Sequence, residues 1–429
     1  MDWKIKKAGS GLKGEIVVPP DKSVSHRAVM FASIAAGSCR ISNFLFAEDC
    51  MRTYEAFRSM GVDITRSGGF IEIKGQGMKA LEQPAGELYM GNSGTSMRIL
   101  SGILAGQDFP ARMTGDESLS RRPMRRVIEP LLSMGAVISS LDGGLPPIST
   151  GPRKAPLKAI SYRTPVASAQ VKSCVLAAGL YADGVTSVTE PFQSRDHTER
   201  MLEYFAADIE RQGLTTSLKG LKELSPRDIE VPGDISSAAF FIVAALLADG
   251  SDVILRKVGL NSTRDGALRV LKRMGGRIEV LDVSGDVEPQ GDIRVRSSSL
   301  KGTVIEAEEI PLLIDEVPVL AVAAAAAEGA TEIRGISELK VKESDRVKSV
   351  VEDLTRLGAE ISEEGDRLII PGGSERFEPA DLESFGDHRI AMSMAVAALI
   401  SGGECVVRNT GCVETSYPAF LADLEKLRA

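Results

Sequence analysis

The sequence predicts an α/β protein made of two similar halves, each built around buried helices. Three observations lead to this prediction. The chain has 429 residues, which is too long for one typical domain. A helix of small apolar residues, followed by Gly and a β-type segment, recurs about six times. A second helix that closes with a Met-Gly or Leu-Gly step recurs in most of these units.

The first helix of each unit is rich in Ala, Val, Leu and Ile and carries little charge. A helix that is apolar all round is normally buried, and Gly just past its end is a C-cap signal. The six helices are expected at residues 28–36, 97–105, 171–182, 238–248, 317–327 and 390–400. The glycines expected to close them are Gly37, Gly106, Gly184, Gly250, Gly329 and Gly403.

The second helices end at Met60-Gly61, Met134-Gly135, Met274-Gly275 and Leu357-Gly358, and a strand follows each of these steps. The third unit has a weaker version near residues 205–209. The sixth unit ends at residues 421–427, with no room for a last strand. Such similarity at a fixed period indicates a repeat architecture. Because the period exceeds that of common solenoids, two compact halves of about three units fit better than an open array.

The boundary between the halves is expected after the third unit. Residues 222–227 are charged there, and Val231-Pro232-Gly233-Asp234 forms a turn signal before the fourth apolar helix. A second break, Pro19-Pro20, precedes the first apolar helix.

Composition excludes several classes of protein. No run of about 18 apolar residues predicts a membrane span, and the N-terminal residues lack the apolar region of a secretory signal. The net charge of −8 argues against non-specific nucleic-acid binding. The cysteines are odd in number and form no C-x-x-C pair, and the three histidines are scattered, so we expect free cytoplasmic thiols and no metal site.

Basic and hydroxyl side chains recur at the predicted helix starts. The start of a helix attracts anions through its unpaired N–H groups and dipole, so a cation there is locally unfavourable. A bound anion between the cations would explain the group Lys22, Arg27, Arg122, Arg346 and Arg389. For any single Ser, an ordinary N-cap is the better interpretation.

Two common phosphate motifs are absent. Gly91-Asn92-Ser93-Gly94-Thr95 lacks the Gly-Lys-Ser/Thr ending of a Walker loop, and no Gly-x-Gly-x-x-Gly opens a dinucleotide-binding unit. We therefore expect side-chain guanidinium groups to hold the phosphates. The sequence thus points to a metal-free enzyme that joins two small phosphorylated anions.

The motifs taken together resemble those of 5-enolpyruvylshikimate-3-phosphate (EPSP) synthases, over nearly the whole chain. Any one motif is weakly specific, but seven in order are strongly specific. Details at residues 168–173 and 195–199 look more like the bacterial class II branch. The seven are Asp21-Lys22-Ser23 with His26-Arg27, residues 91–95, residues 116–123, Ser168-Ala169-Gln170, Asp315, residues 342–346 and Asp387-His388-Arg389.

The resemblance implies the enolpyruvyl transferase-like fold, with six βαβαββ repeats, three in each domain. It implies one domain at residues 21–231 and a second at residues 1–20 and 232–429, with the active site in the cleft between them. It also implies that the first strand belongs to the second domain.

The implied reaction transfers the enolpyruvyl group of phosphoenolpyruvate to the 5-hydroxyl of shikimate 3-phosphate and releases phosphate, without a cofactor. The resemblance assigns catalysis to Lys22, Asp315 and Glu343. It assigns shikimate 3-phosphate to Lys22, Ser23, Arg27, Ser168, Ala169, Gln170, Asp315 and Lys342. It assigns phosphoenolpyruvate to Lys22, Gly94, Arg122, Gln170, Arg346 and Arg389. We expect a monomer with no nucleic-acid or membrane partner.

Asp315 is the candidate base for the 5-hydroxyl. Residues 310–314 before it are mostly apolar, so we expect a largely apolar setting that tunes its pKa. The alternative is an ordinary N-cap of the fifth apolar helix. Lys22 and Glu343 are the candidates for moving protons at C3 of phosphoenolpyruvate.

The other titratable side chains have structural interpretations. His26 and His388 are expected to orient or pack, and His197 to lie at a solvated helix start. Cys39, Cys50 and Cys174 lie beside apolar runs and are expected in the core.

One position departs from the family pattern. The plant and enterobacterial branch has a Lys one residue before Thr-Phe-Pro near the end of the chain, and Thr415 takes that place here. The phosphate contact that this Lys supplies is therefore absent here or is replaced by Thr415 or Ser416, and the sequence does not distinguish between these possibilities.

Two alternatives remain. UDP-N-acetylglucosamine enolpyruvyl transferases resemble this fold, but that family carries a reactive Cys in a mobile loop. The matching residues 115–123 contain no Cys, and Arg27 has no place in that family's site. The second alternative is a non-catalytic anion-binding protein, which the presence of Lys22, Asp315 and Glu343 disfavours.

Overall fold

The computed structural model describes residues 1–9, 11–153, 155–373 and 377–428. The chain forms two compact units. Unit 1 comprises Met1–Pro19 and Pro232–Ala429, and unit 2 comprises Pro20–Val231. The first strands of the chain therefore belong to the same unit as its C-terminal half. The six expected apolar helices are present within about three residues of the predicted bounds, except that the first starts at Lys22, well before the predicted residue 28.

Unit 2 is built on three buried helices, α1 (Lys22–Ser33), α3 (Gly94–Ala105) and α6 (Ala169–Gly179), in which α3 packs against both α1 and α6. Most side chains on these helices are buried on every face. This burial follows from their composition, because small apolar residues allow helices to pack closely on all sides. The starts of the three helices carry most of the candidate residues of unit 2.

Each repeat of unit 2 places a four-stranded sheet against these helices. In one repeat, β6 (Leu88–Tyr89) lies parallel to β7 (Ala111–Thr114), and the hairpin of β8 (Ile138–Leu141) and β9 (Leu145–Thr150) adds antiparallel strands in the order β6-β7-β9-β8. Its second helix is α5 (Arg125–Ser133). The next repeat has the same order, with β11 (Ser161–Arg163), β13 (Val185–Thr189), α7 (His197–Tyr204), β14 (Asp208–Gln212) and β15 (Thr215–Lys219).

The first repeat of unit 2 is completed by the last strand of the unit. Strand β16 (Ile229–Glu230) pairs in parallel with β3 (Ala36–Ser42), next to β5 (Phe70–Gln76) and β4 (Asp63–Ser67). Its second helix is α2 (Glu48–Ser59). The unit is therefore closed by pairing between its two ends.

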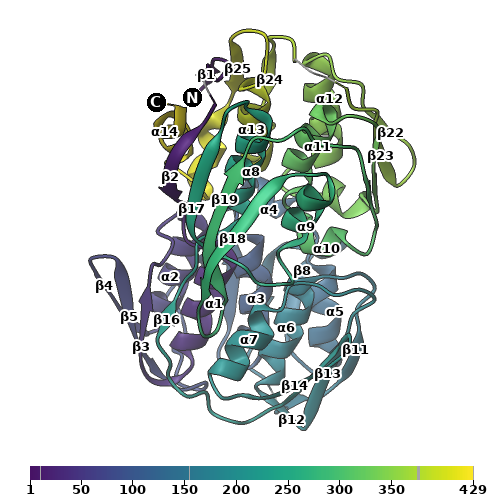
Figure 1. Cartoon of the computed structure of the whole chain (residues 1–429). Helices are drawn as coiled ribbons and strands as arrows, with labels where there is room; N and C mark the ends of the chain where they lie inside the picture. Colours follow the sequence, from purple (N-terminus) through teal and green to yellow (C-terminus); the bar gives the residue numbers. More distant parts are fainter. Residues whose placement is uncertain (10, 154, 374–376, 429) are drawn as a thin grey trace. The chain divides into compact units, whose positions relative to one another are not determined.

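Unit 1 has the same plan around α8 (Ile235–Leu247), α11 (Val317–Ala326) and α13 (His388–Ala398), which lie side by side (Figure 1). One sheet has the order β18-β19-β17-β2, from Arg277–Ser284, Gln290–Arg296, Asp252–Gly259 and Lys13–Val17. Another has the order β20-β21-β23-β22, from Val304–Ile305, Thr331–Arg334, Arg367–Ile370 and Ser362–Glu363. The second helices are α9 (Gly266–Arg273), α12 (Arg346–Arg356) and α14 (Phe420–Arg428).

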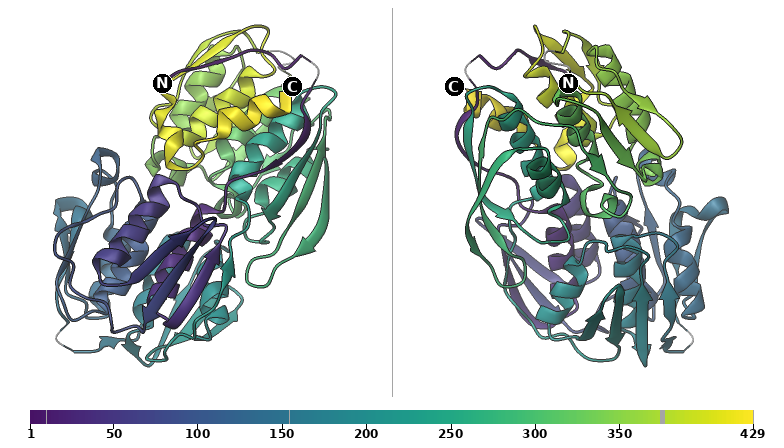
Figure 2. Two further views of the ribbon diagram at one scale, coloured as in Figure 1. Left: turned by 90° about the vertical axis from the view of Figure 1, so that its left-hand side faces the viewer. Right: turned by 45° about the vertical axis from the view of Figure 1, so that its right-hand side comes forward.

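The last repeat receives its final strand from the other end of the chain. Strand β24 (Asp381–Glu383) lies parallel to β25 (Cys405–Arg408), and β1 (Trp3–Ile5) pairs antiparallel with β25, Trp3 opposite Val407. Both chain ends thus lie in unit 1 (Figure 2). The sequence left the sixth unit without a last strand because this partner is some 400 residues away.

The glycines that follow the apolar helices were mostly misassigned. Gly106 is the C-cap of α3, but the caps of the other five are Ile34, Leu180, Ala248, Ala327 and Leu399. The glycines lie further along, and Gly37, Gly184, Gly250 and Gly329 have positive φ. Gly184, Gly250 and Gly329 lie in the segments that lead into the next strand, whereas Gly37 is the second residue of β3.

The Met-Gly and Leu-Gly steps do end the second helices, as predicted. Met60 is the C-cap of α2, and the Gly61 and Val62 N–H groups bond back to Arg58 and Phe57. Gly61 has a φ of 84°, the left-handed conformation that such a cap requires. In the third unit Ala206 takes this place with a φ of 61°, which explains the weaker sequence signal.

No helix among the described residues is long and apolar enough to cross a membrane.

Candidate active site

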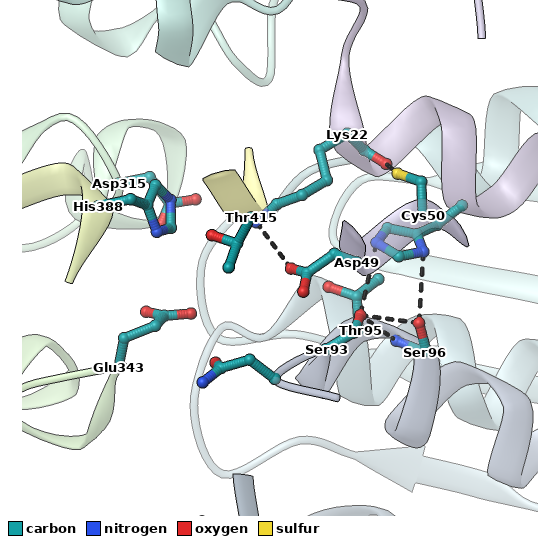
Figure 3. Close-up of polar contacts among 12 residues, drawn as sticks. Lys22, Asp49, Cys50, Ser93, Thr95, Ser96, Asp315, Glu343, His388 and Thr415 are labelled. Carbon is teal, nitrogen blue, oxygen red and sulfur yellow. Dashed lines mark hydrogen bonds and ion pairs between the residues drawn. The ribbon is translucent and has the colours of Figure 1, made fainter. Parts of the chain in front are cut away.

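The start of α1 in unit 2 carries Lys22. The Asp21 carboxylate caps the helix by accepting from the Val24 N–H at 2.9 Å. Lys22 Nζ forms an ion pair with Asp49 Oδ2 at 3.1 Å, from the first turn of α2. Both side chains are mostly buried, and Figure 3 shows the pair beside Cys50, whose thiol contacts the Lys22 carbonyl oxygen at 3.7 Å. Asp49 thus fixes the direction of the Lys22 ammonium group.

His26 lies in a cluster of hydroxyl groups in unit 2. Its Nδ1 is 2.7 Å from Thr53 Oγ1, and its Nε2 is 3.5 Å from Ser93 Oγ. The ring is fully buried. Burial, together with the positive charges of Lys22 and Arg27, holds the pKa of His26 well below its usual value. The imidazole is therefore neutral near pH 7 and serves the hydrogen-bond network, in the orienting role expected for it.

Arg27 is held by three acceptors within unit 2. Its Nε donates to Thr198 Oγ1 at 2.7 Å, one terminal nitrogen donates to Ser173 Oγ at 3.0 Å, and the other donates to the Ser23 carbonyl oxygen at 2.9 Å. Arg27 is only 3% exposed. None of these three acceptors carries a net charge, so they orient the guanidinium group without neutralising it.

Two guanidinium groups flank Gly94 at the start of α3. A Cβ atom at this position would lie 2.7 Å from Arg98 Nη1 and 3.4 Å from Arg122 Nη1. Arg122 Nη2 also donates to Asn92 Oδ1 at 2.6 Å, in the loop before the helix. The absent side chain therefore lets two positive charges approach the helix N-terminus closely, an arrangement that favours an anion.

The start of α6 is linked to the start of α3. Ser168 caps α6 by accepting from the Val171 N–H, and Ala169 is the first helical residue. Gln170 Nε2 donates to Thr95 Oγ1 at 3.0 Å, while its Oε1 accepts from Arg98 Nη1 at 2.7 Å. Gln170 thus holds one of the guanidinium groups beside Gly94. Ser93 and Ser168 are N-caps, as the sequence favoured for a single Ser.

Three carboxylates surround Arg346 in unit 1. Its Nε donates to Asp387 Oδ2 at 2.8 Å, Nη1 to Asp315 Oδ1 at 3.0 Å and Nη2 to Glu343 Oε2 at 2.7 Å. Burial lowers the pKa of Arg346, but the three carboxylates outweigh burial and raise that pKa above its usual value. A single buried cation thus orients Asp315 and Glu343, two of the three candidate catalytic groups.

The setting of Asp315 differs from the expectation of a largely apolar one. Its carboxylate lies 3.0 Å from Arg346, 3.8 Å from Arg389 and 4.0 Å from Arg264. The apolar residues before it form the short helix α10 (Ile310–Leu313), and Ile310 and Leu313 turn into the core. Asp315 is not the N-cap of α11 either, because Glu316 occupies that position.

The remaining candidate residues, like Arg346 and Asp315, belong to unit 1. Arg389 is buried in the first turn of α13, after its cap Asp387. Lys342 ends a short 3-10 helix (Ser337–Val341) and is half-buried. The Thr415 hydroxyl donates to the Cys412 carbonyl oxygen at 2.8 Å, inside its own turn, and Ser416 is buried.

His197 contradicts the sequence prediction. It begins α7 as expected, but it is 2% exposed instead of solvated. The reason is that α7 packs its first residues against α1, so His197, Thr198 and Glu199 are all buried. Cys39, Cys50 and Cys174 are buried free thiols, as predicted.

Sequence reasoning missed four residues that hold the candidates in place: Asp49, Arg98, Ser173 and Thr198. Arg98 lies one helical turn after Gly94, a spacing that brings its side chain back to the start of the helix. That spacing was available in the sequence. The pairing of Thr198 with Arg27, 171 residues apart, had no local signal.

Comparisons with known proteins agree with the resemblance. The family model for EPSP synthase (3-phosphoshikimate 1-carboxyvinyltransferase) matches residues 6–424. A 3-phosphoshikimate 1-carboxyvinyltransferase of Geobacter metallireducens is 51% identical over 429 residues, covering 98% of this chain and 97% of that protein. The counterpart from Bacillus cereus is 48% identical over 425 residues, covering 99% and 98%.

Solved structures show the same similarity. An EPSP synthase from Acinetobacter baumannii has a TM-score of 0.88 and 46% identity, and the alignment covers 99% of this chain and 98% of that chain. The enolpyruvyl transferase NikO from Streptomyces tendae has a TM-score of 0.80 at 20% identity, covering 99% and 96%. The latter similarity concerns the fold alone.

Proposed function

The chain belongs to the EPSP synthase family, and from that premise we propose which of its residues carry the reaction. It transfers the enolpyruvyl group of phosphoenolpyruvate to the 5-hydroxyl of shikimate 3-phosphate and releases phosphate, a step of the shikimate pathway. The hydroxyl adds to C2 of phosphoenolpyruvate as C3 is protonated, which gives a tetrahedral intermediate. Loss of a C3 proton then expels phosphate.

Phosphoenolpyruvate is assigned to Lys22, Gly94, Arg122, Gln170, Arg346 and Arg389. The observation that carries this assignment is the close approach of Arg98 and Arg122 to Gly94 at the start of α3. Forked guanidinium groups match phosphate and carboxylate geometry, and a helix N-terminus adds N–H donors. We add Arg98 to the group, because Gln170 turns it toward Gly94.

Shikimate 3-phosphate is assigned to Lys22, Ser23, Arg27, Ser168, Ala169, Gln170, Asp315 and Lys342. Arg27 supports this assignment, since its guanidinium group is fixed by uncharged acceptors. The assignment draws on both units, and how the two units meet around the substrates remains a prediction of the resemblance.

Asp315 accepts the 5-hydroxyl proton, and Glu343 and Lys22 move protons at C3. Hydrogen bonds from Arg346 support these roles for Asp315 and Glu343, because they hold both carboxylates in fixed directions. General base catalysis needs this kind of positioning within hydrogen-bond reach of the proton.

The reaction is tested by phosphate release from shikimate 3-phosphate and phosphoenolpyruvate. Release is expected with this acceptor and not with UDP-N-acetylglucosamine, and the opposite result would reject the function. Asp315→Asn keeps the shape of the side chain but removes the base, so we expect a folded protein that binds both substrates and turns over about 10²–10⁴-fold more slowly. Near-normal turnover would remove Asp315 from the mechanism.

We also propose that the chain works as a monomer in the cytoplasm. The five cysteines are free thiols, which fits a reducing compartment. Light scattering across a range of protein concentrations tests the monomer, and a constant dimer mass would contradict it.

A further inference from the structure

We propose that Ser173 and Thr198 are positioning residues for Arg27, and that they set the affinity for shikimate 3-phosphate without touching it. This inference rests on the proposed role of Arg27 in binding that substrate. Neither hydroxyl belongs to the group of residues that the family resemblance assigns to the substrates.

The two hydroxyls and Arg27 form a closed triangle in unit 2. Arg27 Nε is 2.7 Å from Thr198 Oγ1, its terminal nitrogen is 3.0 Å from Ser173 Oγ, and the two hydroxyl oxygens are 2.6 Å apart. Thr198 is fully buried and Ser173 is 1% exposed. Water therefore cannot replace either hydroxyl as an acceptor, and each bond restricts the plane of the guanidinium group.

The helices that carry these hydroxyls are fixed by a buried ion cluster. Lys172 Nζ lies 2.5 Å from Glu190 Oε2 and 2.7 Å from Glu199 Oε1, and all three side chains are 2% exposed. Burial lowers the pKa of Lys172, but Glu199 and Glu190 outweigh burial and raise it, so the ammonium group stays charged. The cluster joins α6, the end of β13 and α7.

On each of the two helices, one residue joins the ion cluster and its neighbour in the sequence contacts Arg27. On α6, Lys172 enters the ion cluster and Ser173 bonds Arg27. On α7, Glu199 enters the cluster and Thr198 bonds Arg27. Helix α7 packs against α1, which carries Arg27 (Figure 1). The charged side chains thus fix the two helices, and the two hydroxyls set the direction of the Arg27 guanidinium group.

The test measures the binding of shikimate 3-phosphate by titration calorimetry. Thr198→Val keeps the shape but leaves the buried Nε–H of Arg27 without this acceptor, so the Kd should rise about ten-fold. Thr198→Ser keeps the hydroxyl and should stay within about two-fold of the wild type. Ser173→Ala should weaken binding in the same direction.

Thr186→Val is the matched control. Thr186 is also fully buried in unit 2, and its hydroxyl has no hydrogen-bond partner among the described residues. The same chemical change there should leave the Kd for shikimate 3-phosphate unchanged. In each variant, kcat and the KM for phosphoenolpyruvate should change much less than the KM for shikimate 3-phosphate.

A double-mutant cycle separates the inference from the proposed function. If Arg27→Met does not weaken binding of shikimate 3-phosphate, the proposed role of Arg27 is wrong. If Arg27→Met weakens binding but Thr198→Val does not, only the positioning role is wrong. The inference expects Thr198→Val to have no further effect in the Arg27→Met background. Additive effects, or a Thr198→Ser variant as weak as Thr198→Val, would overturn it.

Discussion

Arg27 in unit 2 and Arg346 in unit 1 are both buried arginines near helix starts, but their partners differ in charge. Arg27 donates to two hydroxyls and a backbone carbonyl, whereas Arg346 donates to three carboxylates. Uncharged acceptors orient a guanidinium group without neutralising its charge. One surrounded by carboxylates holds those carboxylates in place and shares its charge among them.

The two settings also differ in their effect on nearby titratable groups. In unit 2, burial and the positive charges of Lys22 and Arg27 lower the pKa of His26. In unit 1, Asp387, Glu343 and Asp315 raise the pKa of Arg346 against the effect of burial. Burial is the largest cause of the lowered pKa of His26, and Lys22 and Arg27 add to it, whereas carboxylates dominate the charges around Arg346. We infer that the Arg346 cluster mainly positions Asp315 and Glu343, to which the proposed function assigns proton transfer.

The largest effect is expected from a substitution that breaks the cluster of Arg346 and its three carboxylates. Arg346→Met leaves three carboxylates without their shared cation, so the free energy of unfolding should fall by about 3–5 kcal/mol. Arg27→Met should cost only about 1 kcal/mol, because Ser173 and Thr198 can still bond each other. Urea unfolding of both variants measures the difference. Equal losses would show that the charge of the partners does not distinguish the two arginines.

These two arginines also show how far the sequence can predict the site. Both were predicted from basic residues recurring at helix starts, a local pattern. Two partners of Arg346 lie 31 and 41 residues away, and Thr198 lies 171 residues from Arg27, so tertiary packing brings these groups together, whereas Glu343 is only 3 residues from Arg346. The sequence therefore named the cations and the carboxylates Asp315 and Glu343, but it missed how they pair and missed the hydroxyls that hold Arg27. It also predicted an apolar setting for Asp315, which three arginines face.

The fold was more predictable because its strongest signals are local. A helix that is apolar on every face must be buried wherever it lies, and the six central helices appear near their expected positions. The strand β1 had no such signal. It completes a sheet with β25 at the opposite end of the chain, and three residues are too short to predict a partner.

The next largest effect is expected at Gly94, the proposed phosphoenolpyruvate position in unit 2. Gly94→Ala places a Cβ within 2.7 Å of Arg98 Nη1 and 3.4 Å of Arg122 Nη1, so at least one guanidinium group must move. We expect the KM for phosphoenolpyruvate to rise about ten-fold, or 1.4 kcal/mol. Steady-state kinetics with each substrate varied measure the change. A larger rise for shikimate 3-phosphate would place the wrong substrate at Gly94.

A smaller effect tests the buried setting of His26 beside Lys22 and Arg27 through pH. The folded pKa of His26 is lowered, so below about pH 6.5 the unfolded chain takes up a proton that the folded chain does not. Stability should therefore fall as pH falls, by up to about 1.4 kcal/mol per pH unit from this group. His26→Gln should reduce that slope in urea unfolding between about pH 5 and 7.

Proton NMR of the His26 ring during a pH titration measures the pKa of this side chain directly. The ring should remain neutral below the usual pKa of histidine, and a normal or raised pKa would contradict the buried setting of His26 beside Lys22 and Arg27.

The smallest effect compares two repeats within unit 2. Ala206 and Gly135 follow the C-caps of α7 and α5, with φ of 61° and 86°. An L-residue is strained in this conformation, so Ala206→Gly should stabilise the protein by about 0.5–1 kcal/mol. Gly135→Ala is the reciprocal control, because a Cβ there meets no atom within 4 Å and only backbone strain acts. It should lower the thermal midpoint as Ala206→Gly raises it, and shifts of the same sign would show that the weaker third repeat is not limited by its cap.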